Sequence, residues 1–192
     1  ISQGSLTGSK NTAIFNDAID ERDETFTAEL TVIVSGDATI GTPSQQTITI
    51  IDEDGHPAII TPADREIVEG TGAALTELEI PVGLSAPSDF DITVTYGFQD
   101  VEAVKPDDYD GPAGGNTIVI PAGSQLETLI VGIVPDAIDE YNETFKILWT
   151  ASSAQTDGDG DPPISNAETV VTIFNDDIPS LAMHASTVGE AD

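Results

Sequence analysis

The sequence predicts an all-β protein made of tandem Greek-key β-sandwich repeats. Three features support this prediction: period-two apolar patterns, regularly spaced turn residues and internal repetition. In the segment LTELEIPV (75–82), Leu78, Ile80 and Val82 fall on one face and two glutamates on the other. Such alternation is typical of a half-buried strand, and no segment shows a convincing helical period. About seven short strands within ~120 residues are typical of a β-sandwich.

Each strand of the complete repeat has its own apolar run, which a turn signal ends. In chain order the runs are PAIIT, LTELEIPV, FDITVTYGF, NTIVI, TLIVGIV, ETFKILW and ETVVTIF. The predicted strands span residues 57–68, 75–83, 90–98, 116–121, 127–134, 143–151 and 166–174. Clusters of Pro, Gly, Asp and Ser separate the runs, and such clusters mark loops and tight turns. Successive strands are therefore expected to run antiparallel.

Internal repetition divides the chain. Residues 15–30 (FNDAIDERDETFTAEL) match residues 134–149 (VPDAIDEYNETFKILW), and TIIDEDGHPAI (49–59) matches TIFNDDIPSLA (172–182). A weaker match pairs IVEG, just before the second predicted strand, with VGEA near the end of the chain. A self-similar unit of ~120 residues is the sequence signature of a repeat protein. The predicted units are the C-terminal part of one repeat (1–55), a complete repeat (56–177) and the start of another (178–192).

The charge balance restricts the possible partners. The chain has 35 acidic and 5 basic residues, for a formal net charge of −30. Nucleic acids and anionic lipids are poor partners for such a chain, because both are bound through Lys and Arg. A polyanion that binds cations fits this composition, and an acidic, solvated surface without bound ions is the alternative.

Several other site classes are disfavoured. The chain has no cysteine, which excludes disulfides and thiolate metal sites, and the isolated His56 and His184 make zinc a poor candidate. No apolar run approaches the ~18 residues that a membrane span requires, so direct membrane insertion is not expected. Catalysis is also disfavoured. The histidines are badly placed for a nucleophilic triad, and aromatic residues are too few to line a glycosidase cleft.

The acids fall in loops that an antiparallel sandwich brings to one end. Connections between strands one and two, three and four, and five and six share this end with the exit of strand seven. Their candidate ligand residues are Glu69, Asp100, Asp107, Asp108, Asp110, Asp136, Asp139, Glu140, Glu143, Asn175, Asp176 and Asp177. Carboxylates at ~4 Å repel by ~1 kcal/mol in water and more at lower dielectric. Convergent oxygen ligands suit Ca²⁺, which takes about six to eight, better than Mg²⁺.

The motifs D-A-I-D-E-x-x-E-T-F, D-Y, I-V-E-G and the closing N-D-D or D-E-D resemble those of the Calx-beta domain family across essentially the whole chain. The resemblance implies an immunoglobulin-like sandwich with Ca²⁺ at one tip. It implies ligation by Glu69, Asp108, Asp136, Glu140, Asp176 and Asp177, with Asp17, Glu21, Asp52 and Asp54 at the matching places of the first copy. Asp107 and Asp139 complete the candidate set as acids of the same loops.

Two positions depart from the family pattern. Pro135 stands where exchanger domains carry the first of two adjacent aspartates, and Asn175 replaces one acid of the closing triplet. Both changes remove negative charge, so fewer ions or weaker binding is expected, with about one to three ions per complete repeat. Glu143 is a weaker candidate than Glu140, since it directly precedes the Thr-Phe pair of the predicted strand 143–151.

Three further features have mainly structural interpretations. Phe26, Phe145 and Trp149 follow the acidic motif at strand spacing, and core packing is expected for them. The loop DGDGDPPISNAE (157–168) has acids at EF-hand spacing, but Pro162 stands where that loop requires glycine. We therefore interpret it as a turn rather than as an independent calcium site.

The combined prediction is a calcium-rigidified spacer or adhesion repeat of an extracellular or cell-surface protein. Two alternatives stay open: a regulatory calcium sensor, and a calcium-dependent module that binds a carbohydrate or a protein. The expected partners are calcium ions and neighbouring repeats of the same chain, with another protein or a glycan as further candidates.

Overall fold

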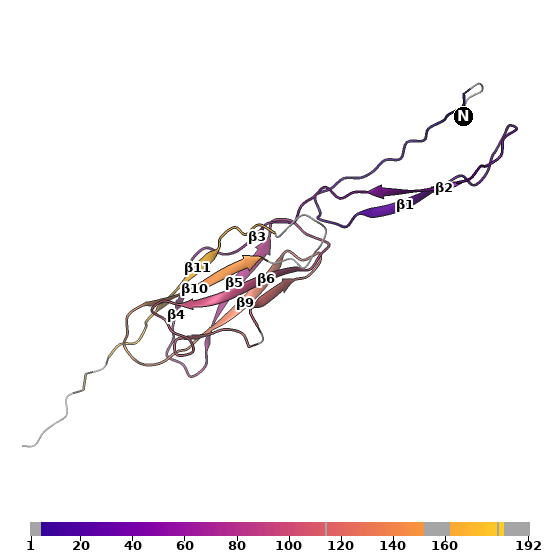
Figure 1. The fold of residues 1–192 in the computed structure, drawn as a ribbon. Coiled ribbons are helices and arrows are strands. Elements are labelled where there is room, and N and C mark those ends of the chain that lie inside the picture. Colours follow the sequence, from indigo (N-terminus) through magenta and orange to yellow (C-terminus); the bar gives the residue numbers. More distant parts are fainter. Residues whose placement is uncertain (1–4, 114, 152–161, 180, 183–192) are drawn as a thin grey trace, which may run out of the picture.

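The computed structural model describes residues 5–113, 115–151, 162–179 and 181–182. It contains a two-stranded sheet followed by a two-layer β-sandwich (Figure 1). The strands are β1 (Glu24–Glu29), β2 (Gln45–Ile50), β3 (Ile59–Ile60), β4 (Arg65–Val68), β5 (Thr76–Leu84), β6 (Ile92–Asp100), β7 (Tyr109–Asp110), β8 (Thr117–Ile120), β9 (Leu126–Ile133), β10 (Glu143–Ala151) and β11 (Glu168–Phe174). Every regular element in the described ranges is a strand. Accordingly, these ranges hold no helix of the length and apolarity that crossing a bilayer demands.

The sandwich confirms the predicted fold class. One layer has the strand order β4-β11-β10-β6-β8, and the other has the order β3-β5-β9-β7. The alternation read from the sequence sets which side chains face the interface between the layers, as in β5, where every second residue is buried. The largest fully buried side chains are Tyr109, Phe145, Ile59, Ile80, Ile92, Ile120, Ile133 and Ile147.

The first predicted strand, 57–68, is divided between the two layers. β3 pairs with β5, whereas β4 pairs in parallel with β11 in the opposite layer. Pro62 lies between them and cannot donate to a ladder. Polar side chains fix the crossing: the Thr61 hydroxyl donates to the Asn166 carbonyl at 2.8 Å, and an Asp64 carboxylate oxygen accepts from the Val170 amide at 3.1 Å.

The aromatic residues of the core confirm two of the packing predictions. Phe145 is fully buried and stacks on Tyr109, with ring centroids 3.9 Å apart and planes 9° apart. Trp149 is 4% exposed, and its indole Nε1 donates to Thr169 Oγ1 at 2.9 Å. Both residues therefore serve the core rather than a binding surface.

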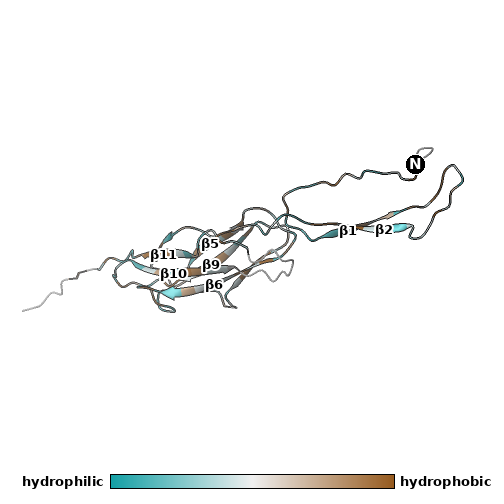
Figure 2. Cartoon of the chain, turned by 45° about the horizontal axis from the view of Figure 1, so that its top comes forward, coloured by the Kyte–Doolittle hydropathy of each residue, from teal (hydrophilic) through white to brown (hydrophobic). Residues whose placement is uncertain are grey.

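β1 and β2 form an antiparallel pair that extends from one end of the sandwich, while residues 175–179 leave the opposite end (Figure 1). Phe26 pairs with Ile48 in this sheet and is only half-buried, whereas its counterpart Phe145 is fully buried. Hydrophilic colouring dominates β1 in Figure 2, in contrast to the apolar colouring along β9. The expected core role of Phe26 is thus only partly realised, because no second layer covers this sheet within the described residues.

Candidate functional site

Four segments meet at the end of the sandwich where β11 finishes, and we call this region the acidic tip. They are the end of β4 at Glu69, the β6–β7 connection, the β9–β10 connection and the exit of β11. Backbone hydrogen bonds join them, from Glu69 N to Phe174 O at 3.0 Å and from Val134 N to Asp108 O at 2.9 Å. The antiparallel strand order expected from the sequence therefore places these loops at one end, as the structure does.

A small cavity lies at the centre of the acidic tip. The space open to the centre of a water-sized sphere is about 10 Å³, which is close to the room for a single water or ion. Its lining residues are Glu69, Asp108, Glu140, Tyr141, Glu143, Ile173 and Asn175. Four carboxylates from three loops thus face one small space.

Glu69 anchors the floor of this cavity. It is 7% exposed, and its carboxylate oxygen Oε1 accepts a hydrogen bond from the Asp136 amide at 3.1 Å. Its carbonyl accepts from the Thr76 hydroxyl at 2.8 Å. Asp136 turns its own carboxylate toward its loop, where Oδ1 accepts from Ile138 N at 2.6 Å. The β4 end and the β9–β10 connection are therefore positioned by the same side chains that carry the negative charge.

Asn175 ties the β11 exit to the β9–β10 connection. Its amide nitrogen donates to Asp139 Oδ1 at 3.2 Å and to the Glu140 carbonyl at 3.0 Å, while its Oδ1 accepts from Asp177 N at 3.1 Å. An aspartate at this position could not donate the first two bonds. The departure from the family pattern at Asn175 therefore exchanges one negative charge for a structural tether.

Charge repulsion and burial raise the pKa values of the tip carboxyls. For Glu143 the pKa rises to about 7, chiefly because burial disfavours the charged form and further because of the negative charges of Asp108 and Glu140. Burial is also the largest cause of the raised pKa values of Glu69, Glu140 and Asp177. All the residues lining the cavity are acidic or uncharged, so the charge is not balanced there.

The donor set of the tip fits a hard cation. Carboxylate and amide oxygens from several loops are the ligands that Ca²⁺ takes, and Asp177 Oδ2 is buried without a hydrogen-bond partner in the described part of the chain. No group of three or more His, Asp or Glu side chains within the described ranges is already drawn together as a metal centre. Holding an ion would therefore require these side chains to close inward.

A second acidic pocket lies at the matching place of the first copy, with a volume of about 390 Å³. Its lining acids are Asp17, Glu21, Glu24, Asp52, Glu53 and Asp54. The Glu21 amide donates to Asp52 Oδ2 at 3.3 Å. Burial is the first cause of the raised pKa values of Glu21 and Asp54, and neighbouring carboxylates raise them further. The chain has no counterpart of Glu69 or Asp108 in this copy, so this pocket is more open.

The remaining candidates lie around the tip without lining its cavity. Asp107 is exposed, and Asp176 is exposed with its Oδ1 accepting from Gly70 N at 2.9 Å. Glu143, the weaker candidate, lines the cavity directly; its match with Glu24 in the other copy was the available signal. The acids of 157–168 that suggested an EF-hand, from 157 to 161, lie outside the described residues, as does His184.

Comparisons with known proteins agree with this geometry. The family model for the Calx-beta domain matches residues 6–54 and 62–177. The Adhesion G-protein coupled receptor V1 of Danio rerio is 29% identical over 143 residues, which cover 73% of this chain but only 2% of the receptor's length.

Two solved structures share the fold. The apo-form Calx CBD1 domain superposes with a TM-score of 0.52 at 21% identity, covering 64% of this chain and 99% of that domain. The Calx CBD2 domain gives a TM-score of 0.50 at 13% identity, covering 64% of this chain and 90% of that domain. At these identities the likeness shows the fold alone. Calx-beta domains are non-catalytic modules that generally bind calcium, which agrees with the absence of catalysis expected from the sequence.

Proposed function

Since the chain belongs to the Calx-beta domain family, we propose that it is a calcium-rigidified spacer or adhesion repeat of an extracellular or cell-surface protein. The observation that carries this proposal is the convergence of Glu69, Asp108, Glu140 and Glu143 on one cavity that no described basic side chain lines. In the proposed division, residues 1–55 end one repeat, 56–177 form a complete repeat and 178–192 begin the next. The extracellular placement rests on the distant similarity to an adhesion receptor.

The proposed ligands are the four carboxylates that line the cavity, together with the nearby acids of the same loops. The Asp136 amide already donates a hydrogen bond to the Glu69 carboxylate, and the buried Asp177 Oδ2 supplies an oxygen that no hydrogen bond satisfies in the described residues. Asp17, Glu21, Asp52 and Asp54 are the corresponding candidates in the first copy. In these places the acids would exchange mutual repulsion for attraction to a shared cation.

The proposed mechanism is thermodynamic linkage. An ion that binds only the folded tip stabilises that state by RT ln(1+[Ca]/Kd), about 2.7 kcal/mol at a hundredfold excess over Kd. The tip is made of the β4 end, two loops and the β11 exit, so an ion there would hold the chain where it leaves the sandwich. Calcium bound at each tip would in this way stiffen a chain of consecutive repeats.

The test is a thermal melt with calcium and with chelator, on the parent chain and on the double variant Asp136→Ala plus Glu140→Ala. We expect calcium to raise the melting temperature of the parent by several degrees, and to raise that of the variant less, because the variant keeps only the first-copy acids intact. Isothermal titration would give the stoichiometry and Kd directly. Equal melting of the parent in both conditions would contradict the proposal.

A further inference from the structure

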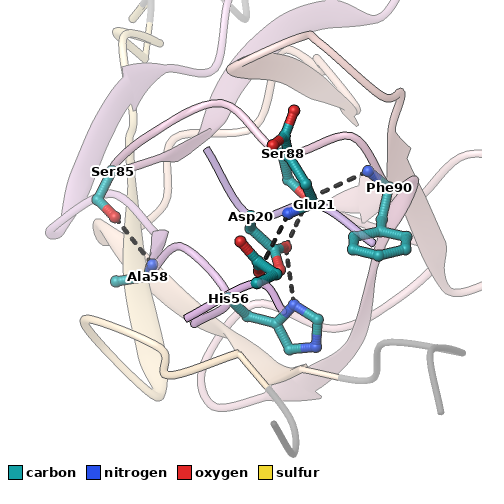
Figure 3. Close-up of polar contacts among 8 residues, drawn as sticks. Asp20, Glu21, His56, Ala58, Ser85, Ser88 and Phe90 are labelled. Atoms are coloured by element: carbon teal, nitrogen blue, oxygen red, sulfur yellow. Dashed lines mark hydrogen bonds and ion pairs between the residues drawn. The ribbon is translucent and has the colours of Figure 1, made fainter. Parts of the chain in front are cut away.

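The end of the sandwich opposite the acidic tip makes a specific contact with the first copy. Asp20, which directly precedes Glu21 of that copy, is 2% exposed although its side chain is ionisable (Figure 3). It forms a parallel bridge with Ser88, in the connection between β5 and β6. A buried carboxylate requires hydrogen-bond partners. Here Ser88 and His56 of the following repeat supply them to Oδ2, whereas Oδ1 is buried without a partner among the described residues.

Two donors converge on one oxygen of Asp20. The Ser88 hydroxyl donates to Asp20 Oδ2 at 2.6 Å, and His56 Nδ1 lies 2.9 Å from the same oxygen (Figure 3). Because a carboxylate only accepts, Nδ1 of His56 carries the hydrogen. The backbone adds a further bond, from Asp89 N to the Asp20 carbonyl at 2.9 Å.

Aromatic contacts surround this polar centre. The Arg22 guanidinium lies 5.0 Å above the ring of Phe90, and the His56 ring meets Phe90 edge-on at 6.2 Å between centroids. The Ser88 hydroxyl also accepts a hydrogen bond from the Phe90 amide at 3.1 Å. Ser88 therefore both contacts Asp20 and stabilises its own turn between β5 and β6. A cation over an aromatic face is attracted by the negative face of the ring, more strongly where the pair is shielded from water.

We propose that Ser88, Phe90 and His56 form a docking site for the loop of a preceding repeat, and that Asp20 and Arg22 are the residues it recognises. The joint fixes the angle between consecutive repeats through the hydrogen bonds to Asp20 and the contact of Arg22 with Phe90. It rests on the repeat array of the proposed function but not on calcium. The partner is thus defined by chemistry: a Calx-beta repeat that offers a carboxylate and, two residues on, a cationic or aromatic side chain.

The complete repeat carries a matching pair in its own β9–β10 connection, at the acidic tip. Asp139 and Tyr141 stand in the places of Asp20 and Arg22. Tyr141 is 93% exposed on the described chain. Such an exposed aromatic side chain is available for contact with a following repeat.

The experiment measures the joint in the full chain in chelator. The chain has no cysteine, so Gln46→Cys and Glu79→Cys place one spin label on β2 and one on β5 without background. We expect a narrow distance distribution that broadens at least about twofold when Asp20→Ala or Ser88→Ala opens the contact. Hydrogen exchange of the Asp89 amide should rise at least about tenfold in both variants.

Controls separate the joint from general destabilisation. Ser85→Ala removes a hydroxyl at the same end that bonds within the sandwich, to Ala58 N, and Asp37→Ala removes an exposed acid of the first copy. Both controls should keep the parental distribution and Asp89 exchange, and the amides of β5 and β9 report that each variant is folded. The effect of the double variant Asp20→Ala plus Ser88→Ala should be smaller than the sum of the two single effects, because each single variant already removes the Ser88–Asp20 hydrogen bond.

Unchanged distances and exchange in Asp20→Ala and Ser88→Ala would overturn the proposal. So would an effect seen only when calcium is present. Neither result would bear on calcium binding at the tip, which the melting of the parent chain tests by itself.

Discussion

Neutralising Glu143 should change stability in opposite directions with and without calcium. The Glu143→Gln variant keeps the shape of the side chain but replaces the carboxyl group with an uncharged amide. Burial and the nearby Asp108 and Glu140 raise the pKa of that carboxyl to about 7. Above that pH the parent tip holds a costly negative charge. The variant should therefore be more stable than the parent in chelator.

The size of the effect follows from the shift. Each pKa unit corresponds to about 1.36 kcal/mol, and the rise from 4.5 to about 7 sets an upper bound of about 3.4 kcal/mol. Solvent screens a half-buried group at the tip, so we expect roughly 1 kcal/mol. For a chain of this size that is a rise of roughly 2–4 °C.

In calcium the order reverses. A hundredfold excess over Kd stabilises the parent by about 2.7 kcal/mol. If the lost carboxylate raises Kd about a hundredfold, the variant gains only about 0.4 kcal/mol. Thermal melts of the parent and of Glu143→Gln, each in chelator and in calcium at about pH 8, give the four melting temperatures. The exposed Glu79→Gln is the control, and its melting temperature should equal that of the parent in both buffers. A Glu143→Gln variant that is less stable in chelator, or that keeps the full calcium shift, would refute this reasoning.

Three further predictions concern pH, ligand identity and the core. In chelator, stability should fall as the pH rises from about 4.5 toward 7, because folded Glu143 binds its proton more tightly than the unfolded chain does; the calcium-induced rise should grow over the same range, and melts between about pH 5 and 8 check both. Asp108→Asn should weaken calcium binding at least about tenfold by titration calorimetry, whereas the exposed Asp107→Asn should stay within about threefold, and equal losses would remove the distinction. Phe145→Ala should lower the free energy of unfolding by about 3–5 kcal/mol in urea, since it empties the stack on Tyr109; a loss below about 1 kcal/mol would contradict the packing.

Periodicity and parity were sufficient to predict most of the fold and the location of the tip. Period two fixes which residues of β5 face the core, and antiparallel order brings the acidic loops to one end. The pattern was insufficient where an element is too short to show a period. The two-residue β7 was not predicted for this reason, although Tyr109 is a central core residue.

Long-range partners account for the other differences. The division of the first strand at Pro62 depends on Thr61 reaching Asn166 and Asp64 reaching Val170, which lie about a hundred positions further along the chain. Likewise, Asp20 looks like another tip acid in the sequence, and its burial becomes visible only once Ser88 is placed beside it. Within the tip, Glu143 lines the cavity although its place beside a strand makes it the weaker candidate in the sequence; its match with Glu24 in the first copy is a signal in its favour.

The parallel pairing of β4 with β11 has a mechanical consequence. The chain enters the sandwich at the joint and leaves it at the acidic tip, so tension along an array pulls these two strands in opposite directions along their length (Figure 1). Four residue pairs, from Arg65 with Val171 to Val68 with Phe174, would then carry the load together in shear rather than one after another. A repeat that resists extension in this way keeps its length until all four pairs break together. Single-molecule stretching would then show one abrupt unfolding step for each repeat.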